Sequence, residues 1–484
     1  MKKVIVIYDD RRMPGREIRT ITGEKSFGET IVKRIPLSGR IREASMAIKN
    51  VRNFITLSEK EDFDKLKREL TNLEYSEKYA FVYLYSNFGI AEKSEFSALL
   101  QKASYVEEIY TALCDGEPAA VLLPDEKSLF ENEERLGKRQ FSENEIAQKA
   151  FADLSVQSRF LAYITGGFDA RFFNALEGDA YTVTKKSSKK EKIKAEYEFY
   201  GLLPDAMKKW FVMPYDYRED QNGASYTMER IHTTDIAIRF VHGAVSTQEL
   251  RDILETLFYF LKTRVKKTVG EEKAGLAAKA AYEDKVISRM KELKAHEAYA
   301  RFDAMIAMGT RFSGIDAVVQ EYLTQYREKR KKAYGMSGHS VAKDALAISH
   351  GDLCFSNILY SREAGLLKLI DPKGAQTEEE LYMDPYYDIA KLSHSICGGY
   401  DYFNSGLYQV SLKQDLKWEL SLDADLDPYR EVFYELLERE GYDKDYVRIC
   451  EAGLFLSMLP YHMDQPGKVF GFLLNAIRIL EQTA

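Results

Sequence analysis

The stretch that decides the fold is HGDLCFSN at residues 350–357, followed at 366–374 by LLKLIDPKG. The first stretch places His, Asp and Asn at offsets 0, 2 and 7, and the second ends a strand-like apolar run in a lone Asp, Asp371. Phosphoryl transfer needs a metal that offsets the phosphate charge and an aligned acceptor hydroxyl. Mg²⁺ prefers oxygen ligands and takes few of them from protein. Asp352, Asn357 and Asp371 supply one carboxylate for the hydroxyl and two oxygen-bearing side chains for the metal.

These residues resemble the catalytic and metal-binding loops of the aminoglycoside phosphotransferase and choline kinase family, which has the protein-kinase-like fold. The resemblance implies that Asp352 is the catalytic base or orients the acceptor hydroxyl, and that His350 braces the loop through backbone contacts. It also implies that Asn357 and Asp371 bind Mg²⁺ and that ATP is the co-substrate. IDPKG stands where protein kinases have D-F-G, which favours a small-molecule kinase. The alternative is a polar surface loop followed by an ordinary strand.

A further stretch, MDPYYDIAKL at 383–392, lies where the resemblance places a structural Asp that fixes the catalytic loop. Asp384 and Asp388 are the two candidates. The resemblance as a whole covers about residues 155–465.

A kinase-like small lobe must precede the catalytic loop, and its expected parts occur in the expected order. TGGFDARFF at 165–173 is the candidate phosphate hairpin, with Gly166 and Gly167, although it lacks G-x-G-x-x-G and a plain turn is an equal alternative. In the next strand, Val183 and Lys185 are two residues apart and share one face. That face suits adenine and phosphate, so we choose Lys185 as the phosphate-binding lysine, with Lys186 as the alternative.

The helix that follows carries the candidate partner of this lysine. Glu196 precedes Phe199 and Tyr200 by three and four residues, which places it at the edge of the apolar stripe. Glu198 is predicted to face water instead. An ordinary exposed helix position remains the alternative for Glu196.

SYTMERIHTTD at 225–235 resembles the strand and hinge that join two kinase lobes. Met228 and Glu229 would offer backbone groups to adenine there. A plain core position is the alternative for Met228. The order of hairpin, lysine, glutamate and hinge ahead of the catalytic loop supports the kinase interpretation more than any one of these parts.

The pattern of the whole chain predicts an α+β protein with a bilobal protein-kinase-like fold preceded by a small α/β domain. Strand-like runs and periodic helical segments alternate over 1–145 and predict that α/β domain. The strands are expected at Val4–Tyr8, Phe81–Tyr85 and Ala119–Leu123, and helices are expected over 59–73 and 94–113. Residues 150–235 are β-rich and predict the small lobe, and 236–484 are mostly helical and predict the large lobe.

Composition excludes several classes of protein. The 484 residues carry a net charge of −7, which gives no reason to expect a nucleic-acid partner. The apolar runs are too short to span a membrane, and the N-terminus lacks the features of a signal peptide. The four cysteines are scattered without a C-x-x-C pair, which favours a reducing cytoplasm and argues against zinc. The oligomeric state is not predicted.

Two stretches of the sequence indicate the class of acceptor. They are AKLSHSICGGYDYFNSGLY at 390–408 and LFLSMLPYHMDQP at 454–466. Both resemble phosphotransferase-like proteins linked to bacterial capsule or surface-polysaccharide synthesis. A sugar or related polyol is therefore the leading acceptor class, with choline or ethanolamine second, since carboxylates and aromatic rings bind cationic acceptors in the related kinases. The candidate pocket residues, for each of which a packed or surface position is an equal alternative, are His394, Tyr400, Asp401 and Asp464.

The N-terminal stretch VIVIYDDRRMPGREIRTITG at 4–23 sets acidic and basic residues just after a strand, where α/β proteins often bind ligands. A structural or oligomerising role is our main interpretation of this domain, and sugar or nucleotide binding is the alternative. For the chain as a whole we expect an ATP-dependent small-molecule kinase. A nucleotide-binding scaffold and a nucleotidyl transferase with a kinase-like fold are the alternatives.

Overall fold

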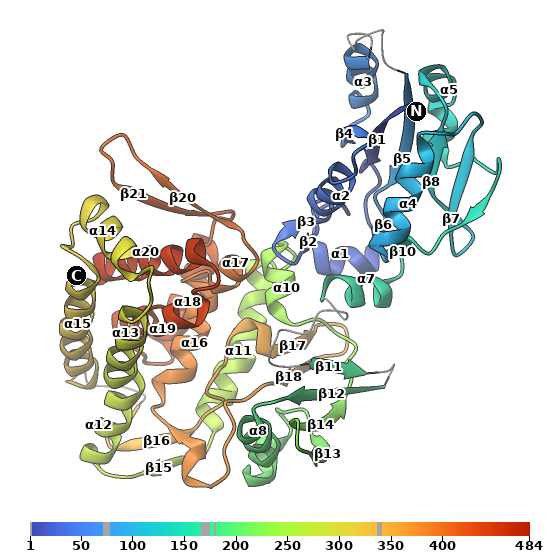
Figure 1. The fold of residues 1–484 in the computed structure, drawn as a ribbon. Helices are drawn as coiled ribbons and strands as arrows, with labels where there is room; N and C mark the ends of the chain where they lie inside the picture. The colour runs from blue at the N-terminus through green and yellow to red at the C-terminus, as the bar shows by residue number, and fades with distance from the viewer. Residues whose placement is uncertain (1, 71–77, 166–174, 179–180, 336–340) are drawn as a thin grey trace. The chain divides into compact units, whose positions relative to one another are not determined.

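The structure is a computed structural model that describes residues 2–70, 78–165, 175–178, 181–335 and 341–484 (Figure 1). The chain forms two compact units, one of Met1–Asp169 with His242–Ala244 and one of Ala170–Val241 with Val245–Ala484. The α+β class predicted from the sequence is confirmed. The candidate phosphate hairpin with Gly166 and Gly167 lies outside the described residues.

The first unit is built on a six-stranded sheet with the order β4-β1-β5-β8-β7-β9. Its strands are β1 (Lys3–Asp9), β2 (Ile31–Val32), β3 (Ile35–Pro36), β4 (Val51–Leu57), β5 (Tyr79–Tyr85), β6 (Phe88–Ile90), β7 (Tyr110–Cys114), β8 (Glu117–Leu123), β9 (Ile146–Ala147) and β10 (Phe151–Asp153). Its helices are α1 (Arg16–Thr22), α2 (Leu37–Met46), α3 (Asp62–Leu70), α4 (Lys93–Ala103), α5 (Glu126–Glu131), α6 (Glu133–Lys138) and α7 (Gln157–Ile164).

The strand pairing of this sheet can be compared with the strands and helices predicted from the sequence. β1 pairs in parallel with β4 along one edge and with β5 along the other, and its residues from Val4 to Asp9 are buried on both faces, as expected for a central parallel strand. The three strands expected from the sequence are confirmed as β1, β5 and β8. The helix expected over 94–113 is wrong in its second half, because α4 ends at Ala103 and Tyr110–Cys114 pairs with β8 as β7.

The small lobe of the second unit is an antiparallel sheet with the order β11-β12-β14-β13, and α8 packs on it. Its elements are β11 (Ala175–Gly178), β12 (Thr182–Ser187), α8 (Lys190–Leu202), α9 (Asp205–Lys208), β13 (Pro214–Glu219) and β14 (Ala224–Glu229). α8 buries Ile193, Glu196 and Phe199, which recur every three residues along one face. Ile193 packs on Ala224 of the sheet, whereas Phe199 belongs to the helical core.

The large lobe is mostly helical and surrounds one extended apolar core (Figure 1). Its helices are α10 (Ile236–Val241), α11 (Thr247–Thr263), α12 (Glu271–Lys279), the π-helical turn η1 (Ala280–Asp284), α13 (Lys285–Lys294), α14 (Tyr299–Gly309), α15 (Ile315–Gly335), the 3₁₀ turns η2 (Phe355–Asn357) and η3 (Glu379–Leu381), α16 (Tyr386–Ile396), α17 (Tyr400–Asn404), α18 (Asp427–Arg439), α19 (Lys444–Met458), the 3₁₀ turn η4 (Leu459–His462) and α20 (Pro466–Thr483).

Short strands in this helical lobe precede the two segments of the candidate site. They are β15 (Lys266–Thr268), β16 (Ala345–Ile348), β17 (Ile358–Ser361), β18 (Leu366–Leu369), β19 (Tyr382–Met383), β20 (Tyr408–Leu412) and β21 (Trp418–Leu422). The quoted loop at 350–357 follows β16, and β17 and β18 form a hairpin that ends just before Asp371. The hairpin therefore brings the two segments of the candidate site together.

Two properties of the described residues concern membrane spans and cysteine pairing. No helix among them is long and apolar enough to cross a membrane. The four cysteines are buried and carry free thiols.

Candidate active site

The candidate catalytic loop at 350–357 is hydrogen-bonded to a buried carboxylate. The backbone N–H groups of His350 and Gly351 donate to the two oxygens of Asp388, at 3.0 and 2.8 Å. Asp388 forms an ion pair with Arg264 at 2.9 Å, and both side chains are fully buried. Of the two candidates for the structural Asp, Asp388 makes these contacts. Asp384 instead accepts from the N–H of Tyr386 at the start of α16.

His350 connects this loop to the strand that precedes Asp371. Its Nδ1 accepts from the N–H of Asp352 at 3.2 Å, and its Nε2 lies 2.8 Å from the carbonyl oxygen of Ile370. Because Nδ1 accepts, the proton is on Nε2, which donates to Ile370. Burial lowers the pKa of His350, in agreement with a neutral ring. His350 therefore acts on the geometry of the loop.

Asp352 presents a half-exposed carboxylate at the centre of the site. Its side chain is 44% exposed, and its Oδ1 lies 2.9 Å from the ammonium of Lys391 on α16. The amide of Asn357 donates to the carbonyl oxygen of Asp352 at 2.8 Å and more distantly to Oδ2. Burial on its own would raise the pKa of Asp352, but the charge of Lys391 and these hydrogen bonds hold it below its usual value. The carboxylate is therefore ionised at neutral pH.

Asn357 and Asp371 are adjacent because their backbones are joined. The N–H of Ile370 donates to the carbonyl oxygen of Asn357 at 3.0 Å, and the N–H of Lys373 donates to that of His350 at 2.8 Å. Asp371 has a φ of 54°, a left-handed conformation that is uncommon for residues other than glycine and is concentrated at functional sites.

The same two residues fit a magnesium ion by their chemistry. One amide oxygen and one carboxylate are hard donors, and Mg²⁺ in nucleotide sites takes one or two carboxylates and completes its shell with water and phosphate oxygens. No cluster of three or more His, Cys, Asp or Glu side chains suited to enclosing a metal is found within the described ranges. Asn357 and Asp371 therefore match a partial ligand set of the kind that shares its metal with a nucleotide.

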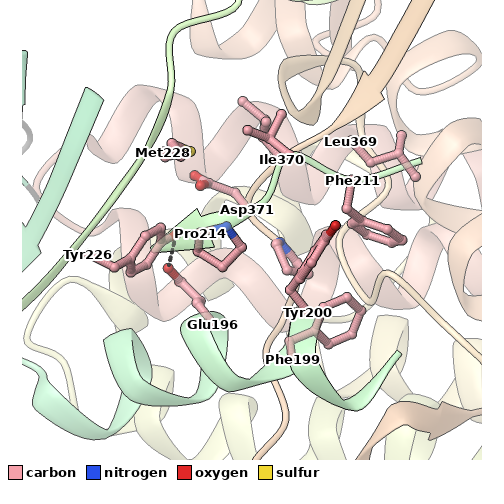
Figure 2. A pocket seen from close by; sticks show the side chains of 12 residues that line it. Glu196, Phe199, Tyr200, Phe211, Pro214, Tyr226, Met228, Leu369, Ile370 and Asp371 are labelled. Atoms are coloured by element: carbon pink, nitrogen blue, oxygen red, sulfur yellow. Dashed lines mark hydrogen bonds between the residues drawn. The ribbon is translucent and has the colours of Figure 1, made fainter. Parts of the chain in front are cut away.

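Lys185 lies between two carboxylates from different parts of the chain. Its ammonium is 2.7 Å from Glu196 Oε2 and 2.9 Å from Asp371 Oδ1. The side chains of Lys185 and Glu196 are almost fully buried, whereas that of Asp371 is 41% exposed. Tyr226 also donates to Glu196, at 3.2 Å (Figure 2). Although burial alone would lower it, Asp371 and Glu196 raise the pKa of Lys185, so the lysine is charged.

The neighbouring lysine and glutamate face the other way. Lys186 follows Lys185 on β12 and is exposed, and Glu198 is half-buried and pairs with Lys194 at 4.0 Å. The alternation of a strand puts Lys186 on the opposite face from Lys185. The contacts at the site are thus made by Lys185.

A pocket opens beside this lysine, between the small sheet and the segment that leads to Asp371 (Figure 2). Met228 lies on its wall, opposite the apolar end of β18. Glu229 is the exposed last residue of β14. The side chains and backbone that line the pocket belong to Glu196, Phe199, Tyr200, Phe211, Val212, Pro214, Tyr226, Met228, Leu369, Ile370, Asp371 and Pro372.

The segment after Asp371 is attached directly to the backbone of α8. Gly374 has a φ of +91°, and a Cβ placed on it would lie 2.8 Å from the backbone of Ala195 and Glu196. The N–H of Ala375 donates to the carbonyl oxygen of Ala195 at 3.0 Å. Only glycine permits this approach, which keeps Glu196 and Asp371 on either side of Lys185.

Two residues of the site were missed in the sequence. Lys391 is a single lysine within the apolar segment YYDIAKLSHSI, and Arg264 ends α11 far upstream. A lysine within a largely apolar helix was the available signal for Lys391, because burying its charge requires a partner. Arg264 gave no comparable signal.

The four residues proposed for the acceptor pocket differ in exposure and in their partners. His394 is buried and stacks on Tyr400, with ring centroids 4.3 Å apart. Asp401 is buried, and its pKa is raised to about 7 by burial. Asp464 is exposed and accepts from Gln465.

At the carboxyl end of β1 in the first unit, Asp9 and Asp10 are bound by neighbouring residues of the same unit. Asp9 forms a salt bridge with Arg11 at 2.7 Å, and Tyr83 donates to Asp9 at 2.8 Å. Asp10 accepts from the hydroxyl of Ser26 and the N–H of Gly28. These carboxylates are therefore satisfied within the unit itself.

Comparison with known proteins gives structural matches only. No protein-family model matches the sequence, and no curated protein does. A thermostable mutant of the aminoglycoside phosphotransferase APH(4)-Ia, in ternary complex with AMP-PNP and hygromycin B, aligns with a TM-score of 0.38 and 11% identity, over 65% of this chain and 92% of that one. The streptomycin-ATP-APH(2")-IIa ternary complex aligns with a TM-score of 0.35 and 13% identity, over 65% and 90%.

A third match is the ethanolamine kinase of Plasmodium vivax, with a TM-score of 0.33 and 13% identity, over 64% of this chain and 78% of that one. Identities and TM-scores at this level carry no functional argument.

Proposed function

We propose that this chain is an ATP-dependent small-molecule kinase that transfers the γ-phosphate to a hydroxyl group of a sugar or an amino-alcohol. The observation that carries the proposal is the position of Lys185 between Glu196 and Asp371. A charged lysine bound by one buried and one half-exposed carboxylate has a firm anchor on one side and can share the other with phosphate and metal.

The nucleotide side of the site follows from these contacts. Lys185 binds the phosphates of ATP, and Glu196 keeps its ammonium in place. Asn357 and Asp371 would hold Mg²⁺, which would offset the negative charge of the transferred phosphate. Met228 and Glu229 bind adenine at the end of β14.

The acceptor side depends on Asp352. Its ionised carboxylate accepts a hydrogen bond from the acceptor hydroxyl and aligns that oxygen with the γ-phosphate. Because its pKa is low, Asp352 takes the proton only as the new bond to phosphorus forms. His350 and Asp388 keep the loop in position from the buried side.

The cellular setting belongs to the same proposal. We propose a cytoplasmic role in cell-surface polysaccharide synthesis, which is supported by the resemblance of 390–408 and 454–466 to proteins of that kind. For the N-terminal unit we propose a structural or oligomerising role. The mutual pairing of its strand-edge carboxylates supports this, since Asp9 and Asp10 are engaged within the unit.

Product analysis tests the proposed reaction. The purified chain is incubated with ATP, Mg²⁺ and a panel of sugars, polyols, sugar phosphates and amino-alcohols, and ADP and pyrophosphate are measured separately. Acceptor-dependent ADP release that is lost in Asp352→Asn supports the kinase. Pyrophosphate release would instead show nucleotidyl transfer, and bound but unreacted ATP with every acceptor would show a scaffold.

A further inference from the structure

A second cavity lies along the C-terminal half of α8, next to the pocket beside Lys185. Its volume is about 430 Å³, within the range of sites that bind small molecules. We call it the outer pocket. It is formed by α8, by the chain at the start of β13 and by the segment that follows Asp371. The residues that line it are Tyr197, Glu198, Tyr200, Gly201, Leu202, Met213, Pro214 and Gln376.

Gly201 indicates that this space is kept open. It lies in the last turn of α8, its φ is not positive, and a Cβ built on it would meet nothing within 4 Å. Neither the backbone conformation nor packing therefore requires a glycine at this position. Glycine also favours a helix less than any residue except proline. Because Gly201 lines the outer pocket, a larger side chain there would take up part of its space.

The lining combines aromatic rings with one charge. Tyr197 and Tyr200 are three residues apart on α8 and lie on the same side of it, and Met213 is 55% exposed. Among the described lining residues, only Glu198 is charged. Its partner Lys194 lies at 4.0 Å, and both side chains are partly exposed, so this ion pair is weak. A ligand cation can therefore replace Lys194 at the carboxylate.

Two residues of the outer pocket also line the pocket beside Lys185. They are Tyr200 and Pro214, one from α8 and one from β13 (Figure 2). A ligand that contacts them in the outer pocket restricts the same two side chains that a nucleotide would meet on the other side. The shared wall is a physical route by which binding at one site changes affinity at the other.

A second connection runs through aromatic rings. The ring centroids of Tyr197 and Tyr226 are 6.4 Å apart, and Tyr226 donates to Glu196 at 3.2 Å. Glu196 in turn lies 2.7 Å from the ammonium of Lys185. The outer pocket is thus connected to the partner of the lysine by one ring contact and one hydrogen bond.

We propose that the outer pocket binds a small aromatic amine, whose ring lies against Tyr197 and Tyr200 and whose ammonium pairs with Glu198. Ring-on-ring contact and a cation beside tyrosine faces both favour such a ligand. Its presence restricts Tyr200 and Pro214 and so strengthens nucleotide binding. The site goes beyond the proposed kinase reaction, because Asp352 and Asn357 are not among the residues that line it.

A pair of probes of opposite charge tests the chemistry of the site. Tryptamine and indole-3-propionate carry the same ring system, one with an ammonium and the other with a carboxylate. Each is titrated calorimetrically into the chain saturated with AMP-PNP and Mg²⁺, so that the proposed nucleotide site is occupied. We expect one tryptamine per chain and binding of indole-3-propionate that is at least about tenfold weaker. Equal or tighter binding of the carboxylate would overturn the proposed ligand class.

Variants of the lining locate the bound probe. Gly201→Leu places a side chain in the pocket and should abolish tryptamine binding, and Glu198→Gln should weaken it about tenfold. Gly275→Leu is the matched control, because Gly275 lies on α12, outside the lining, and its Cβ would also meet nothing within 4 Å. Melting temperatures establish that each variant folds.

Three outcomes would overturn the site. They are the absence of tryptamine binding to the unaltered chain, binding that survives both Gly201→Leu and Glu198→Gln, and a dimer that Gly201→Leu alone dissociates. The last result, read from sedimentation, would show that a second copy of the chain occupies the pocket instead of a small amine.

The coupling has its own measurement. AMP-PNP is titrated into the chain with and without saturating tryptamine, and we expect about fivefold tighter binding with tryptamine, an effect that Gly201→Leu abolishes. Unchanged AMP-PNP affinity would overturn the coupling. This part rests on the proposed nucleotide site, whereas tryptamine binding does not.

The two proposals therefore fail in different ways. ADP release without tryptamine binding would leave the kinase and remove the outer site. Tryptamine binding to a chain that binds no AMP-PNP and releases no ADP would leave the outer site and remove the kinase.

Discussion

Two sets of charged side chains in the second unit use the same chemistry in opposite ways. Arg264 and Asp388 are both fully buried, and their contacts are made to each other and to the surrounding protein. At the candidate site, Lys185 and Lys391 are also largely buried, but each pairs with a carboxylate that is more than 40% exposed.

The exposure of the paired carboxylate distinguishes a structural charge from a candidate functional charge in this fold. A buried pair whose two partners are both enclosed can only hold its neighbours in place. A buried cation paired with a half-exposed carboxylate leaves oxygen atoms accessible to metal or substrate. A substitution in a fully enclosed ion pair should therefore lower the stability of the fold. A substitution in a pair with a half-exposed carboxylate should lower activity or affinity at nearly constant stability.

The largest effect is expected for Asp352→Asn. Turnover should fall about 10²–10⁴-fold, because the amide can neither take the hydroxyl proton nor pair with Lys391 in the same way. Affinity for ATP, measured by titration, and the melting temperature should change little. Glu363→Gln, an exposed position on the β17–β18 turn, is the matched control. A large loss of stability in Asp352→Asn would place Asp352 with the structural charges and break the comparison.

Arg264→Met tests the structural side. Removing one partner of a buried ion pair costs about 3–5 kcal/mol, since Asp388 is left buried without its countercharge. We expect the melting temperature to fall by roughly 10 °C. Arg251→Met, on the same helix, removes a surface pair with Glu435 and should cost less than about 1 kcal/mol. Equal melting temperatures in the two variants would contradict the distinction.

Lys185→Met tests the nucleotide side. The KM for ATP should rise about tenfold or more, because an ammonium that binds phosphate is lost. Lys186→Met alters the exposed neighbour on β12 and should leave the KM for ATP nearly unchanged. If Lys186→Met alone raises it, the assignment of the phosphate-binding lysine is wrong.

A smaller effect is expected for Asp401→Asn, and it depends on pH. Burial raises the pKa of Asp401 to about 7, with Asp352 nearby adding to the shift. An unfolded Asp loses its proton near pH 4, so the folded chain binds one proton more than the unfolded chain between about pH 4 and 7. Stability should therefore decrease across this range as the pH rises.

The amide removes that proton linkage, so Asp401→Asn should raise the melting temperature by a few °C at pH 8 and by less at pH 5. Thermal unfolding at both pH values measures the difference. Asp464→Asn at an exposed position is the control. An equal change at both pH values would show that Asp401 is ionised in the fold.

The sequence predicted those parts of the molecule that are encoded locally. The apolar runs of β1, β5 and β8 are buried strands, and the helix expected to carry Glu196 is α8. Glu196 was expected at the edge of the apolar stripe, from its spacing to Phe199 and Tyr200, and it is buried. Asp371 was found because it ends an apolar run after a loop of unusual spacing. In each case the signal lay within a few residues.

The parts that were missed depend on contacts between distant segments. Tyr110–Cys114 is a strand only because β8 pairs with it, although its composition also suits the end of a helix. The partners of Asp352 and Asp388 are Lys391 and Arg264, and the latter is 124 residues away from Asp388. Nothing local to Arg264 marks it as the partner of a carboxylate so far along the chain.

The close approach of Gly374 to α8 has a consequence for the proposed nucleotide site. The backbones of the loop and the helix touch and share a hydrogen bond, so Glu196 and Asp371 are held at a fixed spacing in the structure without a bound nucleotide. Under the proposed function, nucleotide binding would spend little of its free energy on ordering this part of the site.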